Sequence, residues 1–189
     1  MIGVVTTLFF TAKAARAALL NARAVINAER PHLIFDNAAL KDLYPNKQAP
    51  LGERLYGVDQ PKAVTAQVCL INQGKTPCEI IRAAFLLVAE PLPDAPDYGE
   101  YSTLRGVWIT AGGSYNAQIG CRPEMLEPGR RSRILQGEWP LFLMGHVEYR
   151  SVFEERHESR FAYRFDPQRL TQDGAGWMPE DQPGYWKTS

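Results

Sequence analysis

The stretch "GHVEYRSVFEERHESRFAYRF", residues 145–165, holds the side chains best suited to chemistry in this chain. It contains His146 and His157, two of the three histidines, among arginines, glutamates and aromatic rings. Imidazole changes its protonation state near neutral pH and also binds metal ions. Residues 145–165 are therefore the first place to look for an active site.

The same stretch alternates apolar and polar residues, which predicts a β-hairpin with its turn around residues 154–156. In that register Tyr149 faces Phe161 and Val147 faces Tyr163, as cross-strand pairing favours. The polar set on the other face is His146, Glu148, Arg150, Arg160 and Arg164. Opposite charges along one face are typical of a sheet surface that contacts solvent.

A shared metal site is not expected in this hairpin. The register places His146 opposite Arg164 and His157 at the turn, seven positions and about 23 Å away along the strand. Zinc normally takes three or four ligands, and no other ligand spacing accompanies either histidine. We therefore predict no metal, no cofactor and no catalytic residue in the chain.

An enzyme remains the alternative, because loops carry most catalytic residues. A hydrolytic or metal-dependent site would gather His157, Glu155, Arg156 and Tyr115 where loops meet at one end of the fold. Motif evidence is lacking: the chain has no G-x-S-x-G nucleophile motif and no glycine-rich phosphate loop. "GGSYN" at 112–116 has the glycines of a tight turn before a strand.

Composition limits the partners and the compartment. The 189 residues include 21 basic and 21 acidic side chains, so no net charge attracts nucleic acid, and we expect none as a partner. Cys69, Cys78 and Cys121 are odd in number and form no CxxC pair, which favours free thiols in a reducing compartment. A bridge between Cys69 and Cys78 across a hairpin stays open for an exported protein.

The N-terminal 30 residues predict one long α-helix that ends before Pro31. The segment "MIGVVTTLFFTA" gives 12 apolar residues before Lys13, where a membrane span needs roughly 20. We interpret it as the end of a longer transmembrane helix, and the positive charges after it place the body on the cytoplasmic side of the inner membrane. The alternatives are a signal peptide without its positive start, and a soluble cytoplasmic protein whose helix packs on the body or on a second copy.

After Pro31 the pattern becomes that of strands, with turns such as "NQGKTP" and "EPGRR" between them. Two segments read as core strands, "VTAQVCLIN" and "EIIRAAFLLVA", in which the predicted inward residues are Val64, Ala66, Val68, Leu70, Ile81, Ala83, Phe85 and Leu87. "SRILQ" at 132–136 reads as a further strand. We predict a mainly β fold over residues 31–166, an immunoglobulin-like antiparallel β-sandwich of seven or eight strands behind the long helix.

Residues 167–189 are expected to form an irregular tail that carries Trp177, Tyr185 and Trp186. These rings should lie against the flank of the sandwich, with a partner's pocket as the alternative. Arg130 and Arg131 should sit at a solvated turn, or at an anionic lipid headgroup if that corner meets a membrane. With His157, these five residues are the candidate interaction residues.

The chain resembles a group of uncharacterised bacterial membrane-anchored proteins, often of prophage type. The residues that carry the resemblance are "NAERP" at 27–31, "NQGKTP" at 72–77, and Gly145, Tyr149, Phe153, His157 and Phe161 in the last block. The chain departs from the pattern with Ser151 and Glu154, where Asp and Gly are usual. The resemblance implies an anchor followed by an immunoglobulin-like sandwich, and it implies no activity or ligand.

These observations predict a non-catalytic, membrane-tethered β-sandwich that mediates protein interaction or self-assembly. Two alternatives stay open: the enzyme with a site near His157, and a soluble adaptor whose N-terminal helix dimerises.

Overall fold

The computed structural model describes residues 2–41, 64–120, 128–169 and 176–188. Its helices are α1 (Ile2–Glu29), α3 (Pro128–Leu135) and the short 3-10 helix η2 (Pro167–Arg169). Its strands are β1 (Leu33–Lys41), β2 (Thr65–Asn72), β3 (Cys78–Val88), β4 (Ser102–Ile109), β5 (Ser114–Gly120), β6 (Phe142–Ser151), β7 (Arg156–Phe165), β8 (Trp177–Pro179) and β9 (Lys187–Thr188). The mainly β fold predicted from the sequence is confirmed.

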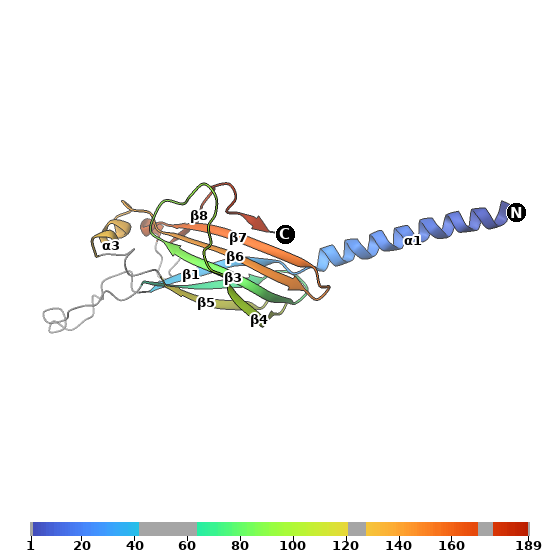
Figure 1. The fold of residues 1–189 in the computed structure, drawn as a ribbon, viewed down its shortest axis with the longest axis horizontal. Helices are drawn as coiled ribbons and strands as arrows, with labels where there is room; N and C mark the ends of the chain where they lie inside the picture. Colours follow the sequence, from blue (N-terminus) through green and yellow to red (C-terminus); the bar gives the residue numbers. More distant parts are fainter. Residues whose placement is uncertain (1, 42–63, 121–127, 170–175, 189) are drawn as a thin grey trace.

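Two antiparallel sheets pack face to face, and α1 extends from one end (Figure 1). The first sheet has the strand order β1-β2-β5. The second has the order β4-β3-β6-β7-β8, and β9 pairs with β7. Along the described strands, the chain therefore changes sheet between β2 and β3, between β4 and β5, and between β5 and β6.

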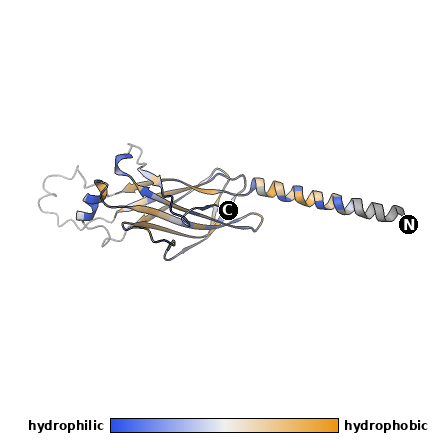
Figure 2. Cartoon of the chain, turned by 90° about the horizontal axis from the view of Figure 1, so that it is seen from above, coloured by the Kyte–Doolittle hydropathy of each residue, from blue (hydrophilic) through white to orange (hydrophobic). Residues whose placement is uncertain are grey.

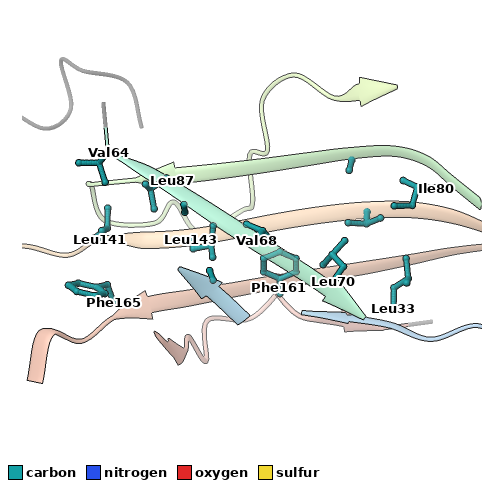
Figure 3. Close-up of a cluster of buried hydrophobic side chains, with 14 of the residues drawn as sticks. Leu33, Val64, Val68, Leu70, Ile80, Leu87, Leu141, Leu143, Phe161 and Phe165 are labelled. Atoms are coloured by element: carbon teal, nitrogen blue, oxygen red, sulfur yellow. The ribbon is translucent and has the colours of Figure 1, made fainter. Parts of the chain in front are cut away.

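The main core fills the space between the two sheets (Figure 3). The predicted inward side of β2 is confirmed, because Val64, Ala66, Val68 and Leu70 are buried. On β3 a β-bulge between Ile80 and Arg82 shifts the alternation by one residue. Ile80 is therefore the buried residue, and the prediction that Ile81 lies in the core is wrong.

Asn72 sits at the point where the chain leaves the first sheet. Its buried side chain accepts hydrogen bonds from the backbone N–H groups of His32, at 3.1 Å, and Gly74, at 3.0 Å. It donates to the carbonyls of Thr76, at 2.8 Å, and Ile109, at 3.3 Å. One amide thus joins the segment after α1, the β2–β3 turn and the end of β4.

The predicted β6–β7 hairpin exists, but its predicted register is wrong by four residues. Tyr149 pairs with His157, and Gly145, not Tyr149, pairs with Phe161. The turn follows Ser151 directly, and the Ser151 N–H donates to the Glu155 carbonyl at 2.9 Å. Glu154 has a φ of 63°, a conformation that favours glycine.

Two segments differ from the expected secondary structure. The stretch containing "SRIL" is the helix α3, not a strand, because Pro128 suits a first helical position and the helix buries Ile134 against the core. The tail, expected to be irregular, contributes β8 and β9 to the second sheet.

The predicted transmembrane helix is wrong. Within the described residues, no helix is both long enough and apolar enough to cross a membrane. The 28 residues of α1 include Lys13, Arg16 and Arg23, which interrupt its apolar character (Figure 2). The predicted end of the helix before Pro31 is confirmed.

Cys69 and Cys78 are free thiols, and they do not face each other across a hairpin. Their strands belong to different sheets, with Cys69 half-buried on β2 and Cys78 in the main core. Burial raises the pKa of Cys78 to about 12. Cys121 lies outside the described residues.

Replacing Asn72 with alanine should destabilise the protein by about 3 kcal/mol, since buried backbone groups lose their partners. The free energy of unfolding from urea denaturation measures the loss. Asn116→Ala is the control, because Asn116 is exposed on β5. Equal stability of the two variants would contradict the role given to Asn72.

Gly145→Ala should destabilise the fold by about 1–3 kcal/mol through overpacking. A Cβ there would lie 2.4 Å from Phe161 Cζ and 2.8 Å from Phe85 Cδ1. Gly120→Ala is the control, because a Cβ at Gly120 meets nothing within 4 Å. Thermal unfolding compares the two; a Gly145→Ala protein as stable as Gly120→Ala would refute the steric argument.

Candidate functional site

The face of the second sheet that turns away from the main core is covered around His146, where the hairpin pattern predicted a solvated face, while Arg164 on the same face is exposed. The loop before β4 and the C-terminal segment lie across this face. Their Tyr98 and Tyr185 pack on Ala84, Met144 and Ala162 of the sheet and form a second apolar cluster. The two covering segments also bind each other. Tyr185 Oη and Gln182 Nε2 donate to the Pro93 carbonyl at 2.9 and 2.8 Å.

His146 lies beneath this cover, opposite Arg160 and only 5% exposed. Its Nδ1 is 2.6 Å from the Tyr101 hydroxyl, and its Nε2 is 3.0 Å from a Glu158 carboxylate oxygen. The Tyr98 ring also packs against the imidazole, with centroids 5.3 Å apart. The geometry fits an imidazole that donates to Glu158 and accepts from Tyr101.

Glu148 and Glu158 face each other on neighbouring strands. Two carboxylates in this position repel unless cations lie beside them. Arg82 pairs with Glu148, while Lys187 and His146 bind Glu158. Tyr101 joins these two groups into one network, because its hydroxyl contacts His146 and the Arg82 guanidinium carbon lies 4.6 Å from the centroid of its ring.

The pKa directions in this network follow from burial and from these pairs. Burial lowers the pKa of His146 from 6.5, and its hydrogen bond to Glu158 only partly opposes this. The hydrogen bond from Lys187 lowers the pKa of Glu158 to about 2. A carboxylate with so low a pKa is a weak general base at neutral pH.

A pocket of about 370 Å³ opens beside the network and contains part of the alternative catalytic set. Its lining residues are Ile81, Glu148, Arg156, His157, Glu158 and Lys187. His157 stacks on Tyr149 with ring centroids 5.4 Å apart, and its Nε2 is 3.9 Å from a Glu155 oxygen. Tyr115 lies on β5 in the other sheet, packed against the main core. The pocket therefore brings Arg156 and His157 together without Tyr115.

The separation predicted for the two histidines of the hairpin is corrected by the observed register. His157 is three residues before Arg160, the partner of His146, so roughly 10 Å of strand separates the two positions. The alternation of side chains puts them on opposite faces. Among the described residues, no group of three His, Cys, Asp or Glu side chains could hold a metal ion.

The tail aromatics predicted as interaction residues take different positions. Tyr185 is buried, and Trp177 is half-buried, with its Nε1 donating to the Ala38 carbonyl at 2.9 Å. Trp186 is 42% exposed and contacts the Tyr163 ring edge-on. Of the three, Trp186 leaves the largest free surface.

Arg130 and Arg131 lie on α3 and not in a turn between strands. Arg130 stacks on the Trp139 ring, with its guanidinium carbon 5.3 Å from the centroid, and Arg133 stacks on the same ring at 4.7 Å. Arg130 is thus engaged in packing of the kind that arginine makes with aromatic faces.

Sequence reasoning did not single out five residues that form or contact the network, namely Arg82, Tyr98, Tyr101, Glu158 and Lys187. The two tyrosines stand in the proline-rich segment "EPLPDAPDYGEY", where aromatic rings are a signal for a loop that packs on the body. Lys187 gave no signal, because only the pairing of β9 with β7 brings it to Glu158.

Comparison with known proteins adds no relative: no family model matches the chain, and neither a curated protein nor a solved structure does.

Stability should fall as the pH drops below about 6.5, and His146 should account for part of the loss. The unfolded chain takes up a proton at this imidazole at a pH where the folded chain, with the lowered pKa, does not. His146→Gln keeps a donor and an acceptor but removes the titration, so its free energy of unfolding should vary less steeply between about pH 5 and 7.5.

His157→Gln is the matched control, since it removes the histidine of the same hairpin that lies on the opposite face from His146. Urea denaturation at each pH gives the three profiles. Identical slopes for the wild type and His146→Gln would show that the network does not exclude the proton.

Proposed function

We propose that this protein is a non-catalytic, immunoglobulin-like β-sandwich that mediates protein interaction or self-assembly. The observation that carries the proposal is the position of its exposed apolar side chains. Among the described residues, the large exposed ones are Leu19, Leu20, Val25, Trp108, Val152, Phe153 and Trp186. All except Trp186 lie on α1 or at the adjoining end of the second sheet.

The elements that carry these residues meet at one end of the molecule. The β6–β7 turn, with Val152 and Phe153, lies near the base of α1 (Figure 1). Trp108 pairs with Glu79, which in turn pairs with Arg150 just before that turn. At the base of α1, the Thr76 hydroxyl donates to the Glu29 carbonyl at 2.8 Å. We call the exposed apolar residues of α1 and this end the helix-side surface.

Clustered exposed apolar residues are typical of binding surfaces, and aromatic residues contribute most to such contacts. The polar network also favours a binding role over a catalytic one. His146 is buried, and the two glutamates are paired with cations, so these groups stabilise the fold and are poorly placed to act on a substrate. A binding module explains both features.

Phe153→Asp should weaken binding at the helix-side surface by about thirtyfold, the effect of losing one aromatic contact residue. Phe153 is 44% exposed, so the fold should tolerate the change. Gln136→Asp is the matched control, because Gln136 is exposed and follows α3 at the opposite end (Figure 1).

Sedimentation of the full chain measures self-association, and retention of proteins from an extract of the native host measures other binding. A species that the wild type and Gln136→Asp retain, and that Phe153→Asp loses, supports the proposal. Identical sedimentation and identical retained proteins for all three would contradict it.

A further inference from the structure

The edges of the two sheets are protected to different degrees. On β1 the Leu33 carbonyl accepts a hydrogen bond from Ser159 Oγ at 2.8 Å, and the Ala38 carbonyl accepts one from Trp177 Nε1 at 2.9 Å. A register shift between Phe35 and Asn37 also breaks the regularity of this edge. Such features prevent a further strand from pairing.

The second sheet is protected in a similar way. On β4 the Gly106 N–H donates to a Glu79 carboxylate oxygen at 3.1 Å, and Gly106 has a φ of 84°. The other side of this sheet ends in β8 and β9, which are 3 and 2 residues long. Short edge strands offer little for a neighbour to bind.

The edge strand β5 has none of these protections. Its seven residues, "SYNAQIG", carry no charge and no proline, and they pair with β2 without a register shift. Among the described residues, no strand pairs with the other side of β5. Its inward residues Tyr115, Ala117 and Ile119 are only half-buried, whereas their β2 partners are fully buried.

The backbone of β5 presents hydrogen-bonding groups at this edge that no other described strand pairs with. The Asn72 N–H donates to the Gly113 carbonyl at 3.0 Å, which fixes the alternation of hydrogen bonds between β2 and β5. Tyr115, Ala117 and Ile119 therefore bond to β2. The N–H and C=O groups of Asn116 and Gln118 point away from β2.

We infer that β5 pairs antiparallel with β5 of a second copy of this chain, in a register centred on Ala117. This inference rests on the proposed function and names its partner. In that register Tyr115 faces Ile119 of the other copy, Asn116 faces Gln118, and Ala117 faces itself. Each pair places either two apolar or two uncharged polar side chains opposite each other, so no like charges meet. A two-fold axis through Ala117 relates the two copies, so the assembly is a closed dimer.

The test compares two double variants with the same positions changed. Asn116→Lys with Gln118→Lys places like charges opposite each other and should weaken the dimer at least tenfold. Asn116→Lys with Gln118→Glu places opposite charges together and should keep wild-type association. Both side chains lie on the exposed face of β5, and thermal unfolding checks that each variant is folded.

Sedimentation of the full chain over about 1 to 100 μM gives the dissociation constants. A wild-type dimer that the Lys/Lys variant loses and the Lys/Glu variant keeps supports the inference. It is overturned if the wild type is monomeric, if the Lys/Lys variant associates like the wild type, or if both variants dissociate equally. Association that resists the Lys/Lys change but is lost in Phe153→Asp overturns β5 pairing alone and leaves the proposed function standing.

Discussion

The buried Asn72 amide is the interaction on which the arrangement of the two sheets depends. The described strands change sheet after β2, after β4 and after β5, and the first two of these crossings occur beside this side chain. It also fixes the segment that follows α1 through the His32 N–H. Gly74 lies so close that a Cβ there would be 2.3 Å from the Arg30 carbonyl oxygen. A larger residue at Gly74 would push the segment after α1 away from the sandwich.

The second sheet is covered on one face by the main core and, around His146, on the other face by the loop and the tail. One face forms the main core, while the other carries the network of His146, Glu148 and Glu158 under the loop and the tail. A buried charge is stable only when it is paired and hydrogen-bonded. These residues meet that requirement within the chain.

Within the part of the chain that the structure describes, few surfaces are then left for a partner. The helix-side surface offers apolar side chains, and β5 offers backbone hydrogen bonds, while β1 and β4 are blocked by Trp177, Ser159 and Glu79. The two surfaces bind by different physics, because apolar burial is largely nondirectional and strand pairing requires one register. A partner at one surface does not exclude a partner at the other.

The sequence alone determined the local elements: α1 ends before Pro31, β2 buries alternate residues, and residues 145–165 form a hairpin. The hairpin faces were also predictable, because the register error of four residues is even and preserves the alternation. Tertiary structure decided the bulge that turned Ile81 out of the core and the cover over His146. These two features depend on contacts between segments far apart in the chain, and a local pattern with a period of two residues contains no information about them. The register was set by the short turn after Ser151, where Glu154 has a positive φ that its residue type does not indicate.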